Sequence, residues 1–211
     1  MKGKFIVIEG PDGAGKSTVC KAINEILEER GYNSFIIRDP GGTPAAEKIR
    51  DIVKNNKLSS REYTLLFMAS RCILVNNEII PAVNEGKIVL CDRFFRSTFI
   101  YQGWYDNPET DEFFKVITEY ADYGVAPDIE FVLNVDAKTA WDRIIARGNN
   151  IDVFKQRYEF TSMINEQYKN IERSKAVFTH PVYEIDANQP LDKVVSDIIA
   201  VLVRNGFSLP S

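Results

Sequence analysis

Short apolar runs alternate with segments of helical spacing along the whole chain. Five of the runs are apolar on both sides, which is typical of strands buried in a parallel sheet. The pattern predicts strands at 5–9, 33–38, 88–91, 129–135 and 182–185. Each strand is followed by a stretch whose apolar residues fall on one side of a helix, so strands and helices are expected to alternate.

Capping and breaking residues mark where these helices start and stop. We predict helices at 16–30, 44–54, 59–85, 137–147, 153–178 and 191–205, and a mostly helical stretch at 96–123 with a break near 104–108. Ser59 and Glu62 form a capping box before the longest helix, and Gly31 and Gly86 each end a helix. The alternation predicts a three-layer α/β/α fold with a five-stranded parallel sheet, in which ligands bind at the carboxyl ends of the strands.

Length, composition and charge narrow the class of protein. A chain of 211 residues with 45% apolar residues is the size of one domain, 1–211, with a sizeable core. The net charge of −4 and the lack of a basic stripe argue against a nucleic-acid partner. No apolar run approaches the about 20 residues that span a bilayer, and we recognise no signal peptide, so no membrane partner is expected.

The cysteines and the single histidine change this picture little. Three cysteines without a CxxC pair, together with one histidine, argue against a zinc site and are typical of a cytoplasmic protein with reduced thiols. His180 precedes Pro181 beside a predicted strand. We interpret it as structural.

A glycine-rich phosphate-binding loop follows the first strand. Residues 10–17 read GPDGAGKS, a full match to G-x-x-x-x-G-K-[ST]. Its glycines let backbone N–H groups surround an anion, and the next helix adds its positive end. Lys16 can reach the β- and γ-phosphates of a nucleotide, and the Ser17 hydroxyl can bind Mg²⁺. The predicted nucleotide site comprises Gly10, Gly13, Ala14, Gly15, Lys16, Ser17 and Thr18.

Three further segments carry polar chemistry to the same edge of the sheet. Residues 38–43 read RDPGGT after the second strand, with Arg50 two helical turns later. Phe67 and Arg71 are spaced i,i+4 on one helix face. Residues 92–98 read DRFFRST after the third strand and continue to a YQG segment at 101–103. Because all four segments end strands or start helices, they can converge on one site.

Together these segments resemble thymidylate kinases of the bacterial type over nearly the whole chain. Members of that family carry the phosphate loop, then T-R-E-P-G-G-T, L-L-F-x-A-x-R and D-R-[FYH]-x-x-S-x-x-A-Y-Q-G, in this order. The segment VYEIDA at 182–187 is also similar to the family's Y-x-x-I-D-A strand. The chain departs from the family at Asp39, Leu74 and Ile100, and at Val153, which stands where the lid motif R-G-x-x-D-R has its second arginine.

The resemblance implies a fold and an activity. The expected fold is of the P-loop NTPase type, a single nucleoside monophosphate kinase domain with a short lid at about 147–157. The implied reaction transfers the γ-phosphate of ATP to dTMP, giving dTDP and ADP, with Mg²⁺ as cofactor. ATP, dTMP and a second copy of the chain are the implied partners, because family members pack as homodimers through long helices.

The resemblance also implies roles for individual residues. Those expected to act on the transferred phosphoryl group are Lys16, Asp12, Arg93 and Arg147. In the expected acceptor site, arginines bind the 5′-phosphate and other side chains bind the base and sugar. The residues of this acceptor site are Asp39, Arg50, Phe67, Arg71, Arg93, Ser97, Thr98, Tyr101 and Gln102. Mg²⁺ is expected at Ser17 and Asp92, and the adenine side of ATP at Arg143.

Several alternatives stay open at this point. Asp136 also ends a strand and competes with Asp92 for the metal, although the sequence after Asp136 favours a helix cap. Asp12 could shape its loop as an Asx-turn residue, and Phe67 could belong to the core. Arg157 is the alternative to Arg147 in the lid. An acceptor such as dUMP or a 5-substituted dUMP, or a phosphate-loop switch without kinase activity, is the alternative to a dTMP kinase.

Overall fold

A five-stranded parallel sheet forms the centre of the molecule. The computed structural model describes residues 3–103, 111–146, 154–170 and 177–207. The strands lie in the order β2-β3-β1-β4-β5 and are all parallel. Their bounds are β1 Lys4–Glu9, β2 Ser34–Arg38, β3 Ile88–Asp92, β4 Ile129–Asn134 and β5 Val182–Asp186. The predicted parallel sheet is therefore confirmed, with each strand within one residue of its expected ends.

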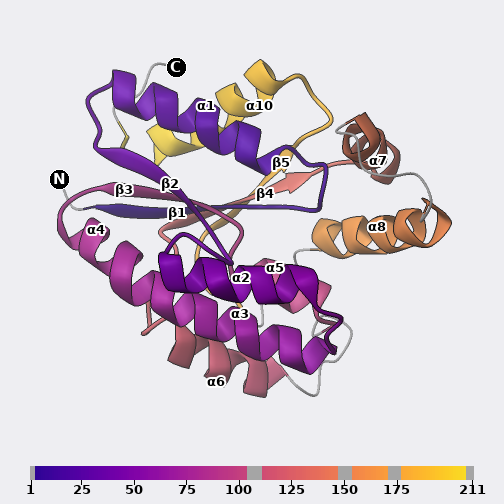
Figure 1. Cartoon of the computed structure of the whole chain (residues 1–211). Coiled ribbons are helices and arrows are strands. Elements are labelled where there is room, and N and C mark those ends of the chain that lie inside the picture. The colour runs from indigo at the N-terminus through magenta and orange to yellow at the C-terminus, as the bar shows by residue number, and fades with distance from the viewer. Residues whose placement is uncertain (1–2, 104–110, 147–153, 171–176, 208–211) are drawn as a thin grey trace.

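Helices cover both faces of this sheet (Figure 1). One face carries α1 and α10, Lys16–Glu29 and Leu191–Arg204, whose apolar sides pack on the inner strands. The other face carries α3 Ser60–Leu74, η1 Val75–Ile79, α4 Ile80–Asn84, α5 Phe95–Tyr101 and α6 Asp111–Ala121. Helix α2, Pro44–Asn55, packs against α3. The predicted three-layer architecture follows from these two buried faces.

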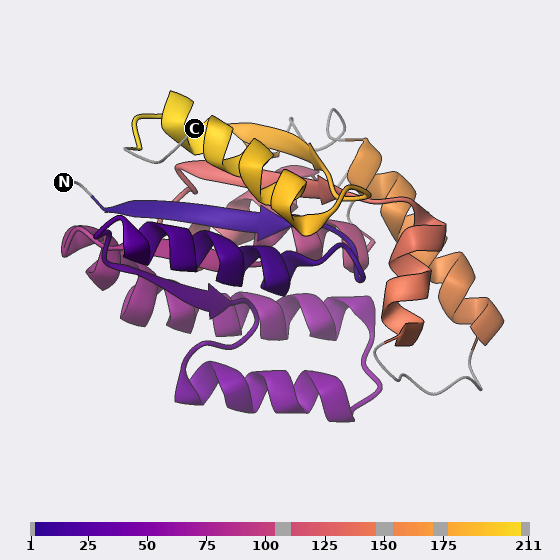
Figure 2. The same cartoon turned by 90° about the horizontal axis from the view of Figure 1, so that it is seen from above.

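The strands all point toward one end of the molecule. Helices α7, Ala137–Ala146, and α8, Phe154–Lys169, stand at that end (Figure 2). The loop between β1 and α1 and the residue after β3 open onto the same end, because parallel strands bring their carboxyl ends together. This arrangement positions the candidate site.

The longest helical run contains a feature that the sequence did not reveal. Ser59 and Glu62 form the predicted capping box, and helical structure continues from Ser60 to Asn84. Its middle, Val75–Ile79, is a π-helical turn, just before Pro81. Proline has no N–H and its ring collides with the carbonyl four residues earlier, so the widened turn accommodates it.

The same run, Ser60–Asn84, is long and apolar enough to cross a membrane by length and composition alone. It contains Arg71, whose side chain is only 1% exposed, and it packs against the sheet with Leu74, Val75 and Ile79 in the core. Core helices of globular proteins share this composition, and the packing of this run is of that kind.

One predicted helix is too long, and other expectations fall outside the described part. The segment predicted as helical from 153 to 178 ends at Lys169. Val177 and Phe178 are buried but not helical, and the Phe178 ring packs edge-on against Phe99. Their apolar spacing reflects core packing rather than a continuing helix. The expected break at 104–108 and residues 147–153 of the expected lid lie outside the described residues.

A buried charge network ties α5 to β4. The Arg96 guanidinium and the His180 ring both pair with the Glu130 carboxylate, and Arg96 and Glu130 are each 3% exposed. Burial alone would raise the pKa of Glu130, but the charge of Arg96 and the bond with His180 outweigh it and lower that pKa to about 2. His180 therefore has a structural partner, in line with its interpretation from the sequence.

Glu130 should make the stability of the protein depend on pH in the acid range. A Glu in an unfolded chain has a pKa of about 4.3, above the folded value of about 2, so the stabilisation is present above pH ~4.3 and is lost as the pH falls toward 2. Glu130→Gln should cost about 3 kcal/mol at pH 7, because it removes the carboxylate from a buried ion pair with Arg96.

The measurement is the free energy of unfolding from urea titrations between pH 7 and pH 3. The difference between wild type and Glu130→Gln should shrink as the pH falls. Glu28→Gln, a change at an exposed glutamate of α1, is the control and should leave the pH profile unchanged. A constant difference between wild type and Glu130→Gln would contradict the assignment.

Candidate functional site

Two adjoining cavities open where β1, β2 and β3 end. The larger has a volume of about 250 Å³ and lies between α2, α3 and α5. The smaller, of about 200 Å³, lies against the phosphate loop and is lined by Gly13, Gly15, Lys16, Ser17 and Asp92 among others. Four residues line both cavities: Asp12, Asp39, Arg50 and Arg93. A group bound in one cavity is therefore next to a group bound in the other.

The phosphate loop has the backbone that an anion site needs. Gly13 has φ +83°, and a Cβ there would lie 2.3 Å from the Ala140 carbonyl oxygen, so only glycine fits. Gly15, with φ +93°, precedes the first turn of α1, where free N–H groups point into the smaller cavity. The Lys16 ammonium donates to the carbonyls of Gly10 and Pro11 at 3.0 and 2.8 Å. Burial and the nearby Arg93 lower the pKa of Lys16 to about 8.

The two residues predicted to bind Mg²⁺ lie side by side in this cavity. The Ser17 hydroxyl donates to the Asp92 carboxylate at 2.5 Å. Both offer hard oxygen ligands, which suits Mg²⁺ when phosphates and waters complete its shell. No group of three or more His, Cys, Asp or Glu that could hold a metal occurs within the described residues. A metal at Ser17 and Asp92 therefore depends on a bound nucleotide.

The competing carboxylate, Asp136, has different surroundings. Its backbone N–H donates to the Asn188 side chain, its carbonyl accepts from Ala140, and its carboxylate lies 3.9 Å from Lys169. It lines neither of the two cavities. These contacts fit the helix-start interpretation of Asp136, and Asp92 is the carboxylate that faces the phosphate loop.

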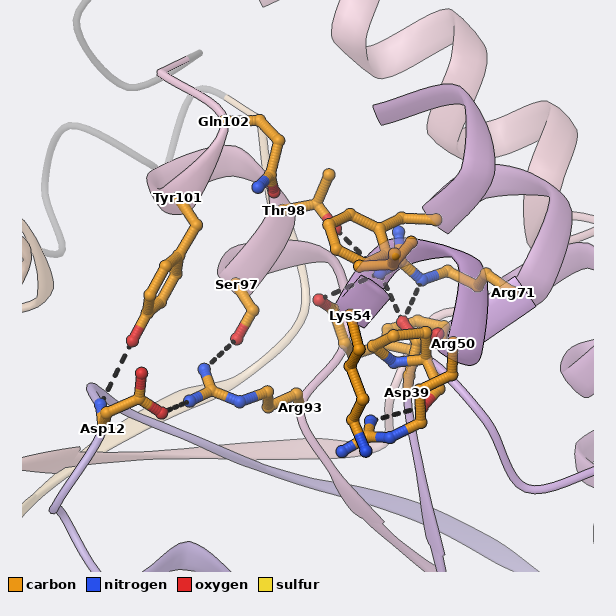
Figure 3. Close-up of a pocket in the computed structure, with 14 residues that line it drawn as sticks. Asp12, Asp39, Arg50, Lys54, Arg71, Arg93, Ser97, Thr98, Tyr101 and Gln102 are labelled. Atoms are coloured by element: carbon orange, nitrogen blue, oxygen red, sulfur yellow. Dashed lines mark hydrogen bonds and ion pairs between the residues drawn. The ribbon is translucent and has the colours of Figure 1, made fainter. Parts of the chain in front are cut away.

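Arg93 lines both cavities, and its guanidinium contacts Asp12 and Ser97 (Figure 3). Its Nη2 donates to the Asp12 carboxylate at 2.5 Å, and its Nη1 donates to Ser97 Oγ at 2.8 Å and to the Gly10 carbonyl at 3.3 Å. The Tyr101 ring packs on the guanidinium, 5.1 Å from its centre. The backbone of Arg93 has φ +74°, a strained conformation for an arginine that is typical of functional sites.

Tyr101 also supports the phosphate loop. Its hydroxyl accepts a hydrogen bond from the Asp12 backbone N–H at 3.1 Å. Burial raises the pKa of Tyr101 to about 12, so its hydroxyl stays protonated at neutral pH. The sequence predicted a contact with the sugar; the structure adds this link between the larger cavity and the loop.

Arg71 connects the segments that surround the larger cavity. It pairs with the Asp39 carboxylate and donates to the Phe94 carbonyl at 3.2 Å and to Thr98 Oγ1 at 2.9 Å. Its guanidinium lies 4.1 Å from the centre of the Phe95 ring. The Nη1 atom has a weaker contact, 3.6 Å from the Met68 sulfur. Arg71 is thus largely committed to holding the cavity together, with Nη1 as the donor left for a ligand.

Three polar atoms around the larger cavity are buried without a hydrogen-bond partner among the described residues. They are Asp39 Oδ1, Arg50 Nε and Gln102 Oε1. Burial raises the pKa of Asp39, and Arg50 also donates through Nη1 to the Pro40 carbonyl at 2.7 Å. Unpartnered buried groups are costly and uncommon in folded proteins. A polar ligand in this cavity would supply the missing partners.

Two of the remaining predicted site residues, Phe67 and Arg143, line different cavities. Phe67 lines the larger cavity and stacks with Tyr63, the ring centres 6.0 Å apart. Arg143 lines a third cavity of about 220 Å³ behind the phosphate loop, with Thr18, Leu191 and Val194, and donates to the Ala187 carbonyl at 2.9 Å. Arg147 lies outside the described residues. Its role in the lid stays a prediction.

Sequence reasoning missed two residues beneath the site. Glu9 is fully buried and accepts hydrogen bonds from the Phe94 and Ser97 backbone N–H groups at 2.7 and 3.0 Å. Glu9 thereby caps the N-terminus of α5, because Phe94, the residue before this helix, makes no side-chain capping hydrogen bond. Tyr168, on α8, contacts both Glu9 and Ser97. A carboxylate that ends an apolar strand was the available signal for Glu9; the sequence carries no local signal for Tyr168.

Comparisons with known proteins agree with this geometry. The family model for thymidylate kinase matches residues 8–198. A curated thymidylate kinase of Thermoanaerobacter sp. (strain X514) is 40% identical over 206 residues, 97% of this chain and 99% of the relative. One of Clostridium novyi (strain NT) is 35% identical over 93% of this chain and 97% of the relative. The crystal structure of thymidylate kinase from Ehrlichia chaffeensis has a TM-score of 0.76, with 26% identity, over 96% of this chain and all of that one.

The lowered pKa of Lys16 should make the binding of a nucleoside triphosphate depend on pH. The ammonium is lost as the pH rises through about 8 in the free protein, whereas a bound phosphate favours the charged form. Affinity should therefore fall above pH 8, approaching tenfold per pH unit.

Titration calorimetry at pH 9 in two buffers of different ionisation enthalpy checks this expectation. The wild-type protein should take up close to one proton per ATP bound. Lys16→Met should bind more weakly and take up none. Equal proton uptake by the two proteins would place the titrating group elsewhere.

Proposed function

The chain belongs to the thymidylate kinase family, and from this premise we propose how its residues transfer the γ-phosphate of ATP to dTMP. The protein is an ATP-dependent nucleoside monophosphate kinase, and its products are dTDP and ADP. One observation carries the proposal: the phosphate-loop cavity and the larger cavity share Arg93, Asp12, Asp39 and Arg50. Donor and acceptor phosphates bound in these cavities would meet at that shared wall.

ATP binds on the phosphate-loop side of this wall in our proposal. The loop amides and Lys16 hold its β- and γ-phosphates, with the positive end of α1 behind them. The third cavity, which combines Arg143 with the apolar Leu191 and Val194, suits the adenine. Ser17 and Asp92 would hold Mg²⁺ against the phosphates. When bound, the ion neutralises charge on the β- and γ-oxygens.

The larger cavity takes dTMP in this proposal. Arg50 and Arg93 face the place where the acceptor phosphate meets the donor, and guanidinium groups fit phosphate oxygens bidentately. Phe67 offers a ring for stacking on the base. The unpartnered Gln102 Oε1 suits the N3–H of thymine, which is a donor, and Arg71 Nη1 suits the O4 acceptor. Thr98 holds Arg71 in place, and Tyr101 closes the cavity beside the sugar.

The chemistry requires charge neutralisation and alignment rather than a strong base. The acceptor phosphate monoester has a second pKa near 6 and is largely dianionic at pH 7. Bringing two anions together is the main obstacle, so catalysis depends on positioning and on cations. Arg93, held by Asp12 and Ser97 at the shared wall, is suited to neutralise the transferred group. Lys16 acts on the donor side.

The two alternative functions receive less support. Leu74 and Ile100, at which the chain departs from the family motifs, are buried and line neither of the two main cavities. Asp39, a third departure, does line both cavities, but it keeps the carboxylate of the family's glutamate and pairs with Arg71. We therefore propose dTMP as the acceptor ahead of dUMP or a 5-substituted dUMP. A phosphate-loop switch would have no use for a second cavity with the unpartnered Gln102 and Asp39 oxygens.

The surface and the thiols support the remaining proposals. Large apolar side chains are exposed along α3 and α6, with exposures from 54 to 84%: Leu65, Phe113, Val116 and Tyr120. A second copy of the chain packed against these helices would cover these side chains, which supports a homodimer.

Cys20, Cys72 and Cys91 are free thiols, which supports a cytoplasmic location. The partners that we propose are ATP, dTMP and this second copy, without nucleic acid or membrane.

A panel of acceptors tests the function directly. ADP release should be fast with dTMP and slow with AMP, CMP and GMP, because adenine and cytosine lack the ring N–H donor and adjacent carbonyl acceptor that match Gln102 and Arg71, and guanine, which has them, is a larger purine. Gln102→Ala should raise KM for dTMP about tenfold, the usual cost of one lost hydrogen bond, while KM for ATP stays unchanged. Turnover of AMP, CMP or GMP without turnover of dTMP or dUMP would refute the proposal.

A pair of matched variants tests the metal site. Asp92→Asn should raise the Mg²⁺ concentration for half-maximal turnover about tenfold or more, because an amide is a weaker ligand than a carboxylate for this ion. Asp136→Asn makes the same change at an aspartate just after β4, which is separated from β3 by β1, and should leave the Mg²⁺ titration unaltered. The reverse pattern would assign the metal to Asp136.

A further inference from the structure

A buried polar cluster supports Arg93 through Ser97, which itself lines the larger cavity. The cluster consists of Glu9 at the end of β1, Ser97 on α5 and Tyr168 on α8, three elements that are far apart in the sequence. Ser97 Oγ, at 2.8 Å from Arg93 Nη1, is its point of contact with Arg93. Figure 3 shows Arg93 directed between Ser97 and Asp12.

The contacts of the cluster allow its protons to be placed so that Glu9 accepts from both hydroxyl groups. Arg93 Nη1 donates to Ser97 Oγ, so the Ser97 proton must point elsewhere, and Glu9 Oε2 lies 2.7 Å away as its acceptor. The Tyr168 hydroxyl donates to the same Glu9 oxygen at 2.9 Å and lies 2.9 Å from Ser97 Oγ. Glu9 therefore orients both hydroxyl groups. The Ser97 oxygen is left free to accept from Arg93.

Packing alone does not account for the Tyr168 hydroxyl. The Tyr168 side chain is 1% exposed within the apolar core, and a phenylalanine would fill the same space. A hydroxyl group buried there costs free energy unless it is hydrogen-bonded, and its partners here are Glu9 and Ser97. Burial and the Glu9 carboxylate raise the pKa of Tyr168, so the hydroxyl remains a donor.

We propose that Tyr168 is a positioning residue for phosphoryl transfer, which acts through Glu9 and Ser97 to hold the Arg93 guanidinium at the wall shared by the two cavities. The inference rests on the proposed function, because it matters only if Arg93 acts on the phosphate groups. Tyr168 itself lines neither of the two cavities. Its effect on catalysis is therefore carried by Arg93.

The removal of one hydroxyl group tests the inference. Tyr168→Phe keeps the ring in the core and removes a donor to Glu9, so Ser97 and Arg93 lose orientation. Its kcat with dTMP should fall about tenfold, and KM for ATP should change less than about twofold, because the donor side is untouched. Tyr183→Phe is the matched control: its ring packs on Phe131, and its hydroxyl only accepts from Asn205 at 3.3 Å. Its kcat should stay at the wild-type value.

A double-mutant cycle separates positioning from a general loss of packing. Tyr168→Phe and Ser97→Ala should each lower kcat, and the double variant should be little worse than Ser97→Ala alone, because both act on Arg93 through one chain of contacts. Independent effects would multiply instead, and that result would overturn the inference. If Tyr168→Phe fails to fold, Glu9→Gln takes its place in the cycle, because an amide whose oxygen accepts the two hydroxyl protons turns its NH₂ group toward the Phe94 and Ser97 backbone N–H groups, which also need an acceptor.

These outcomes separate a failure of the proposed kinase function from a failure of the role proposed for Tyr168. A wild-type protein without dTMP turnover would refute the proposed function. A wild-type protein that turns over dTMP, with Tyr168→Phe as active as Tyr183→Phe, would overturn only the role of Tyr168. A kcat that is lowered in Tyr168→Phe and unchanged in Tyr183→Phe is the result that we expect.

Discussion

The hydrogen bonds that hold the Arg93 guanidinium are the constraint on which the rest of the site depends. Arg93 follows β3 in a left-handed conformation, and its side chain meets Asp12 from the phosphate loop and Ser97 from α5. This cation lines both cavities, so in the proposed function it serves the donor and the acceptor phosphate without moving. Charged donors fixed by hydrogen bonds need no reorganisation when charge develops on a ligand, which is why such positions favour catalysis.

Much of the fold and part of the site could be predicted from local signals. Apolar runs predicted the five strands, and the capping box at Ser59 and Glu62 predicted the start of the longest helix. The phosphate loop and the DRFFRST segment each follow a strand of a parallel sheet, so their meeting at one edge was predictable from topology. The resemblance to a family supplied the roles of the residues, and the geometry then brought Arg50, Arg71 and Gln102 around one cavity.

What could not be predicted depends on contacts between distant segments. Glu9 and Tyr168 are 159 positions apart, and no local sequence pattern predicts that a tyrosine of α8 will contact a carboxylate of β1. The pairing of Glu130 with Arg96 and His180 has the same character. The end of α8 was misjudged because Val177 and Phe178 keep a helix-like apolar spacing while they serve the core as non-helical chain. Apolar spacing reports burial, and burial does not require a helix.

The ligand-free site carries an energetic cost that a nucleotide can remove. Lys16 and Arg93 lie close enough that Arg93, together with burial, lowers the pKa of Lys16 to about 8. Buried polar atoms of Asp39, Arg50 and Gln102 have no hydrogen-bond partner in the described part of the chain. Like charges held together and unpaired polar atoms both disfavour the folded state. Phosphate oxygens can provide counter-charge to Lys16 and Arg93 and accept from Arg50 Nε, whereas Asp39 Oδ1 and Gln102 Oε1 need a donor such as the N–H of a base. In the proposed function a nucleotide meets both needs, and its binding stabilises the folded protein.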